Sequence, residues 1–187
     1  TVVHRLSADT QKIDLSGWVA VLTDASGTLT AAQVGALAAS GAMTAVANPK
    51  TPMLRERIEH VVWLKLDVAA DPAAPADWRL VIWPPIHDHN SLYVRARDGS
   101  WTPVPAIRER NIMVDIRTSP GEVTSMLLRV QDSGAAPVKA TLWQPDAFWE
   151  SERLVVGLYC LYFGLLGGMM LYNLMLFLSL RDRSHLY

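Results

Sequence analysis

Alternating hydrophobic and polar residues recur along the N-terminal part of the chain. In Val61–Val68 the even-numbered residues are all Val or Leu, whereas the odd-numbered ones that follow Val61 are Trp63, Lys65 and Asp67. Successive side chains of a strand point to opposite faces, so this pattern predicts a half-buried β-strand. Ser91–Arg97 alternates in the same way. Further strands are predicted at Gly17–Leu22, Trp78–Trp83, Asn111–Ile116, Thr124–Val130 and Val138–Leu142.

Turn-forming residues separate these strands and support an all-β fold. The turns are predicted at Asp98-Gly99-Ser100, Ser119-Pro120-Gly121 and Asp132-Ser133-Gly134. One helix interrupts the pattern, with Thr28 or Thr30 as its N-cap and an end before Gly41. Short strands at this spacing predict a β-sandwich, which we place at residues 1–148. We expect both Trp78 and Trp83 to belong to its core.

A long uncharged segment follows the predicted sandwich. Residues 154–180 contain no Asp, Glu, Lys or Arg. A helix rises about 1.5 Å per residue and needs about 20 apolar residues to cross a bilayer, so this segment predicts one transmembrane helix within residues 149–187. Arg181 and Arg183 follow the segment, whereas Glu150 and Glu152 precede it. The positive-inside rule therefore predicts a cytoplasmic C-terminal end and a periplasmic sandwich, in a bacterial inner membrane.

Small and polar residues inside the apolar segment indicate neighbouring helices. Gly164 and Gly168 form a GxxxG pair, which allows close approach of another helix. Glycine is also common in membrane helices, so a chance pair is an equal alternative. Asn173 is a polar side chain that is costly to expose to hydrocarbon. We therefore expect further helices of a longer chain beside this one, and a second copy of the chain is a further candidate partner.

Composition and charge exclude some functions. Of all residues, 50% are hydrophobic and 19% are charged, and the excess of apolar residues lies in the uncharged segment. Residues 1–152 hold 14 Lys and Arg against 17 Asp and Glu, a formal charge of −3. Such a domain does not favour phosphate contacts, so no nucleic-acid partner is predicted. The only cysteine, Cys160, lies in the apolar segment, so the polar part has no disulfide or cysteine-based metal site.

Outward positions of the predicted strands supply a candidate ligand surface. The candidates are Trp63, Lys65, Tyr93, Arg95, Arg97 and Arg129. An aromatic ring with neighbouring donors can stack on a sugar or hold an anion. The outer face of a half-buried sheet is polar in any case, and a sandwich has two outer faces. A solvated surface is therefore the favoured interpretation, and one shared binding surface is the alternative.

Metal and catalytic signatures are weak. His87 and His89 are two residues apart, but a zinc site needs three or four ligands and the sequence marks no third one. A surface turn is therefore favoured there. Motifs of serine hydrolases, zinc proteases, phosphate-binding loops and dinucleotide-binding folds are missing. We predict no cofactor and no enzymatic activity for this segment, although a hydrolase can hold its residues on separate loops.

Several segments in sequence order resemble the extracellular sensor domain of 7TMR-DISM proteins, bacterial seven-transmembrane receptors with diverse intracellular signalling modules. The matching segments are WVAVLTDASGTLT at Trp18–Thr30, VVWLKLDV at Val61–Val68, WRLVIWPP at Trp78–Pro85, SLYVRARDGSW at Ser91–Trp101, LRVQDSGAAPVKATLWQPDAF at Leu128–Phe148 and LYNLMLFLSLRDRSHLY at Leu171–Tyr187. One departure lies in Pro103–Arg110, which has Pro105 and Arg108 without the Gly-Asp of many members.

The resemblance implies a jelly-roll-like sandwich similar to carbohydrate-binding modules, followed by the first of seven membrane helices. It also implies a small-molecule or carbohydrate ligand and a cytoplasmic output, commonly a diguanylate cyclase or a histidine kinase, that this chain does not contain. Two alternatives stay open. One is a membrane-anchored hydrolase of glycans, and the other is a periplasmic protein–protein interaction module.

Overall fold

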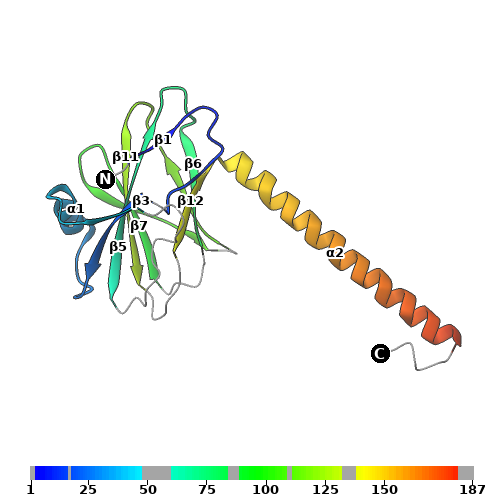
Figure 1. Ribbon diagram of the computed structural model, residues 1–187. Helices are drawn as coiled ribbons and strands as arrows, with labels where there is room; N and C mark the ends of the chain where they lie inside the picture. The colour runs from blue at the N-terminus through cyan, green and yellow to red at the C-terminus, as the bar shows by residue number, and fades with distance from the viewer. Residues whose placement is uncertain are drawn as a thin grey trace. The chain divides into compact units, whose positions relative to one another are not determined.

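The structure, a computed structural model, describes residues 3–16, 18–47, 60–83, 89–108, 111–131 and 138–180 (Figure 1). The chain divides into two compact units, Thr1–Pro145 and Asp146–Tyr187. The first unit is a sandwich of two mostly antiparallel sheets, and the second contains one long helix. The predicted turn at Asp132-Ser133-Gly134 lies outside the described residues.

The larger sheet has seven strands, and its central strands are long. Its order is β4-β3-β5-β11-β7-β8, and β1 pairs with β5 in parallel. Its strands are β1 (Val3–Leu6), β3 (Trp18–Asp24), β4 (Thr44–Ala47), β5 (Val61–Ala70), β7 (His89–Arg95), β8 (Trp101–Val104) and β11 (Val123–Gln131). The register places Lys65 opposite Leu127 and Leu127 opposite Tyr93, so residues from three strands form rows across each face.

The smaller sheet has five strands in the order β2-β12-β6-β10-β9. Its strands are β2 (Lys12–Asp14), β6 (Asp77–Trp83), β9 (Ile107–Arg108), β10 (Ile112–Arg117) and β12 (Lys139–Trp143). All seven predicted strands are therefore confirmed, with ends that shift by at most two residues. The additional strands are at most four residues long, too short to show a clear period in the sequence.

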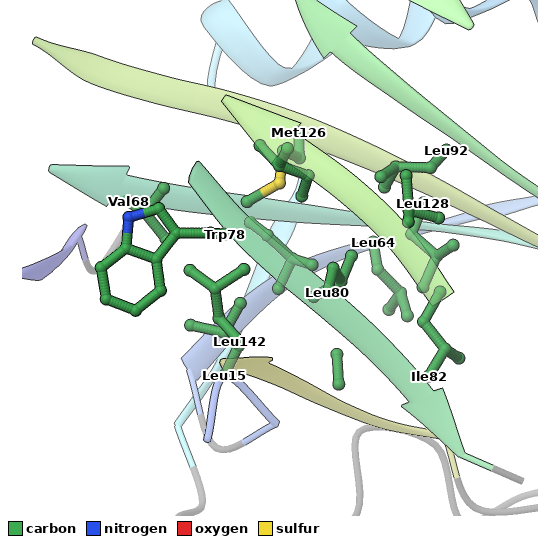
Figure 2. Close-up of a cluster of buried hydrophobic side chains, with 14 of the residues drawn as sticks. Leu15, Leu64, Val68, Trp78, Leu80, Ile82, Leu92, Met126, Leu128 and Leu142 are labelled. Carbon is green, nitrogen blue, oxygen red and sulfur yellow. The ribbon is translucent and has the colours of Figure 1, made fainter. Parts of the chain in front are cut away.

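The core lies between the two sheets and is apolar. Figure 2 shows Leu80 and Ile82 of β6 facing Leu64 of β5 and Leu128 of β11, and all four side chains are fully buried. Burying one such side chain stabilises the fold by about 1.5–3 kcal/mol. These residues occupy the inward positions that the alternation predicts. The sandwich can therefore bury a sufficient core without any disulfide.

The two tryptophans at the ends of β6 differ in environment. Trp78 is buried, and its Nε1 donates a hydrogen bond to the Pro75 carbonyl at 2.7 Å. Trp83 is 52% exposed, so the prediction that it belongs to the core is wrong. Ile82 takes the inward position, and the period of two turns Trp83 to the outer face. An almost continuously apolar run concealed this alternation in the sequence.

Helix α1 (Ala31–Ala39) covers part of the outer face of the larger sheet (Figure 1). Thr30 is its N-cap: the Gln33 N–H donates to Thr30 Oγ1, and the Thr30 N–H donates to Gln33 Oε1 at 2.9 Å. The choice between Thr28 and Thr30 is thereby settled. Ala31 and Val34 pack with Trp63 and other apolar residues in a second cluster outside the sandwich.

The turn before α1 is built around the buried carboxylate of Asp24. This carboxylate accepts hydrogen bonds from the Ser26 hydroxyl at 2.7 Å and from the backbone N–H groups of Gly27 and Leu29 at 2.9 and 3.0 Å. Burial raises the pKa of Asp24, but these hydrogen bonds outweigh it and hold the pKa below the ordinary value of 3.8. Arg129 adds a contact from its guanidinium to the Gly27 carbonyl at 3.4 Å.

Helix α2 (Pro145–Leu180) is the long helix of the second unit. It is long and apolar enough to cross a membrane, and none of its most apolar window is buried, unlike a core helix. The helix begins earlier than residue 154 because Pro145 is well suited to a first helical position. Gly164, Gly168 and Asn173 lie exposed on it, and their packing against other helices stays a prediction.

Candidate ligand-binding groove

The outer face of the larger sheet has two parts. One part is covered by the second apolar cluster, in which Trp63, Leu127 and Val34 are buried and which we call the α1 cluster. Beyond Leu127 the face is polar, because Lys65 and Asp67 follow Trp63 on the outward positions of β5. We call the hollow over this second part the β5–β7–β11 groove.

The β5–β7–β11 groove has a volume of about 530 Å³, which is in the range of small-molecule sites. Its lining residues are Lys65, Asp67, Val94, Arg95, Ala96, Arg97, Gly99, Arg117, Ser119, Glu122, Val123, Thr124 and Ser125. Three strands supply part of this lining, and the turns that follow β7 and β10 supply the rest. The sheet is a rigid support, whereas the two turns position the side chains at the rim.

Tight turns fix this rim. Gly99 and Gly121 have φ values of 85° and 76°, a left-handed conformation that glycine adopts without strain. The Ser100 hydroxyl and backbone N–H donate to Asp98 Oδ1 at 2.6 and 2.9 Å. These hydrogen bonds also hold the pKa of Asp98 below its ordinary value. The turn after β7 is therefore closed by its own side chains.

Lys65 and Asp67 form an ion pair at the floor of the groove. Their side chains are only 17% and 5% exposed. The second oxygen of Asp67, Oδ1, is buried and accepts no hydrogen bond from the described part of the chain. A buried carboxylate is costly without a partner, so Asp67 holds the Lys65 ammonium in place. The floor therefore presents a fixed cation beside an incompletely paired carboxylate.

The rim of the groove carries three arginines. Arg97 lies 3.7 Å from Glu122 and 3.4 Å from the Ser119 hydroxyl, and Arg117 lies 3.4 Å from Asp77. Both arginine side chains are more than 80% exposed, so each pair contributes about 0–1 kcal/mol. The side chain of Arg95 makes no ion pair or hydrogen bond with the residues described here.

Positive charge gathers in the groove although the domain is acidic. Four basic residues line it against the two acidic residues Asp67 and Glu122, a local excess of two positive charges. Residues 1–152 as a whole carry a formal charge of −3. The lining of the groove therefore has a formal charge opposite in sign to that of the domain, which favours an anion over a cation in it.

The structure brings three of the six predicted ligand residues together in the groove: Lys65, Arg95 and Arg97. It does not place Trp63 there. Trp63 is 1% exposed beneath α1, so the expectation that it offers an outward ring is wrong. Tyr93 lies against it, with 5.7 Å between the ring centroids. Arg129 contacts the turn before α1 instead.

Sequence reasoning missed three lining residues: Arg117 at the end of β10, and Ser119 and Glu122 in the turn between β10 and β11. Arg117 belongs to the other sheet, and only the fold brings it near Arg97. Asp67 was visible as the outward neighbour of Lys65 in the alternating pattern.

Of the two weak metal-binding candidates, His87 lies outside the described part of the chain. His89 begins β7, and only its backbone is described. Among the described residues there is no group of three or more His, Cys, Asp or Glu side chains that could hold a metal ion.

Residues 16–144 match the protein family described as 7TMR-DISM extracellular 2. The curated proteins contain no match to this sequence. Among solved structures, the apo β-glucuronidase of Ruminococcus gnavus is 10% identical, with a TM-score of 0.47 over 72% of this chain. Its complex with D-glucuronic acid is 9% identical, with a TM-score of 0.47 over 73% of this chain. The chain spans only 29% and 30% of those two proteins, and at these values the likeness carries no argument about activity or ligand.

Proposed function

Because the match covers most of its length, the chain belongs to the 7TMR-DISM extracellular 2 family, and we propose that it is the ligand-sensing part of a transmembrane signalling receptor. The family consists of extracellular sensor domains rather than catalytic ones. The sandwich is therefore extracytoplasmic, and α2 is a candidate membrane helix. The bacterial inner membrane, a periplasmic sandwich and a cytoplasmic end after α2 are part of the proposal.

The observation that carries this proposal is the direct connection between the sensor and the membrane helix. Strand β12 ends at Trp143 and α2 begins at Pro145. Gln144, the one residue between them, is anchored to the sandwich: its side-chain amide donates to the Thr10 carbonyl at 2.7 Å, and its backbone N–H donates to the Gln11 carbonyl at 2.9 Å. One hydrogen-bonded residue therefore separates the last strand of the sandwich from the first residue of α2.

A ligand acts as a signal only if it binds two conformations with different affinity. We propose that the ligand binds in the β5–β7–β11 groove and favours one conformation of the sandwich. Helix α2 and further membrane helices of the same chain then relay that preference to a cytoplasmic output, such as a diguanylate cyclase or a histidine kinase. The jelly-roll order, the likeness to carbohydrate-binding modules and the functional boundary near residue 148 belong to the same proposal.

Changing the rotational phase of α2 tests the relay. Each residue of an α-helix advances the chain by about 100° around the helix axis. Two alanines inserted after Glu152 therefore rotate the following part of the helix by about 200°, whereas four rotate it by about 40° beyond a full turn. In the full-length receptor we expect the two-residue insertion to abolish the response of the output to ligand and the four-residue insertion to retain part of it. An unchanged response in both receptors contradicts a rigid relay.

The alternatives predict different results with the same chain. A membrane-anchored glycan hydrolase releases sugars from cell-wall glycans, and an interaction module captures a protein but no small ligand. Arg95, Arg97 and Lys65 favour a small anionic ligand over both, because they surround a hollow rather than a flat surface.

A further inference from the structure

We infer that the β5–β7–β11 groove selects a small hydroxylated carboxylate, the class that includes sugar acids and hydroxy acids; this inference rests on the proposed function and names the class of its ligand. The groove carries three features that such a molecule satisfies together: available guanidinium groups, an unpartnered hydroxyl group and acidic acceptors.

The first feature is the availability of the rim arginines. The side chain of Arg95 has no ion pair or hydrogen bond within the described residues, and its Nη2 lies 3.8 Å from the point where a Cβ of Gly99 would stand. Arg97 and Arg117 are held by long, exposed pairs that an incoming anion can replace at little cost. A guanidinium donates two parallel hydrogen bonds to a carboxylate, so these residues favour a planar anion.

The second feature is a hydroxyl group without a protein partner. Ser125 lies on β11 opposite Asp67 of β5, on the outward face of the sheet, and its half-buried side chain makes no hydrogen bond within the described part of the chain. Thr124 also lines the groove, but it pairs with the core residue Val68, so the alternation of the strand turns its side chain to the other face. A hydroxyl can both donate and accept, so the Ser125 side chain can bind a hydroxyl of a ligand.

The third feature decides between anions. Glu122 at the rim and Asp67 at the floor accept hydrogen bonds from ligand hydroxyls, but they repel negative charge. The positive excess in the lining is only two charges. A singly charged carboxylate with hydroxyl donors satisfies both sets of groups, whereas a phosphate dianion brings its second charge close to the acidic ones.

The same lining disfavours a neutral sugar. Recognition of a neutral ring commonly uses stacking on an aromatic face, and none of the described residues that line the groove is aromatic. Trp63 and Tyr93 belong to the α1 cluster instead. Charge and hydroxyl groups, rather than stacking, therefore determine the ligand.

Titration calorimetry on the full 187-residue chain in detergent micelles tests the inference with matched probes. D-galacturonate and D-gluconate are the acids, D-galactose and sorbitol their neutral counterparts, and inorganic phosphate the third arm. We expect at least one acid to bind at least tenfold more tightly than its neutral counterpart and more tightly than phosphate, with an affinity that falls as salt rises. Equal or tighter binding of the neutral sugars or of phosphate, or no binding of either acid, overturns the inference.

Two arginine variants locate the site. Arg95→Gln should weaken acid binding at least tenfold, and Arg95→Lys should recover only part of it because lysine lacks the planar fork. Arg5→Gln removes the same charge from an exposed position on β1 outside the groove and should change the affinity less than twofold. Equal effects of Arg95→Gln and Arg5→Gln overturn the site. The comparison of acid with neutral sugar on the unmodified chain remains decisive even if Arg95→Gln folds poorly.

This outcome is separable from that of the relay test. If the acids bind but the output responds equally in both insertion variants, the proposed relay is refuted and the inference about the ligand class is retained. If the output depends on the rotational phase of α2 but only the neutral sugars bind, the relay is supported and the inference about the ligand class is refuted.

Discussion

Gly35 in the middle of α1 gives a prediction in which two physical effects have opposite signs. A Cβ added at Gly35 would lie 2.1 Å from Nε1 and 2.8 Å from Cε2 of the Trp101 indole. Side-chain Cβ atoms essentially never approach other atoms closer than 3.0 Å, so Gly35→Ala forces α1 or Trp101 to move. That contact closes the α1 cluster on the side of β8.

The sizes of the two effects decide whether Gly35→Ala stabilises or destabilises the domain. Alanine is better than glycine inside a helix by about 1 kcal/mol, so propensity alone predicts that Gly35→Ala stabilises the domain. Overpacking a tight contact costs about 1–3 kcal/mol. We therefore expect a net destabilisation of about 1 kcal/mol, which lowers Tm by about 3–5 °C for a domain of this size.

Thermal unfolding in detergent micelles, followed by the near-ultraviolet circular dichroism of the tryptophans, measures this change. Ala36→Gly is the matched control, because it sits at an exposed position of α1 and reports propensity without the indole contact. In a Trp101→Leu background the same Gly35→Ala change should become neutral or stabilising, since the ring is gone. A Gly35→Ala protein with a Tm raised by several degrees refutes the close packing of α1 on Trp101.

Three further predictions concern the core, the turn before α1 and the groove floor. Trp78→Ala should cost about 3–5 kcal/mol in urea unfolding, whereas Trp83→Ala should change stability by at most about 0.5 kcal/mol, because only Trp78 is buried. Because the pKa of Asp24 is lowered in the folded state, its contribution to the free energy of unfolding is complete above the ordinary pKa of 3.8 and is lost as pH falls through the lower pKa of the folded state. Measurements of the free energy of unfolding between pH 2 and 7 should show that loss. Asp24→Asn should remove this part of the slope and cost about 1–3 kcal/mol at pH 7. Lys65→Met should cost about 3–5 kcal/mol by leaving Asp67 uncompensated, and adding Asp67→Asn should recover most of it; equal losses in the single and double variants contradict a coupled pair.

Much of the fold follows from local periodicity. The alternation at Val61–Val68 and Ser91–Arg97 predicted which residues face the core, because a period of two is a property of any strand with one buried face. The uncharged run to Leu180 predicted a long apolar helix for a similar reason. Edge strands such as β2 and β9 are too short to show a period, so only their pairing partners define them.

The candidate site was less predictable because it depends on contacts between distant segments. Trp63 occupies an outward position, as the alternation indicates, but α1 returns over that position and buries it. The burial of Trp63 thus depends on a helix about 30 residues earlier in the chain, and the alternating pattern of the strand carries no information about that helix. Arg117 and Glu122 reach the groove because the chain passes from β10 in the smaller sheet to β11 in the larger sheet between them, so spacing along the chain gave no signal for them.

Hydrogen–deuterium exchange of the chain in lipid nanodiscs, with and without saturating D-galacturonate, tests most directly whether this domain senses a ligand through the groove. We predict slower exchange in residues 95–100 and 117–125, which include the rim and the β11 part of the lining, and little change in α1 at Ala31–Ala39. Protection confined to α1 or to the outer face of β6, or no protection anywhere while the acid is bound, contradicts the account.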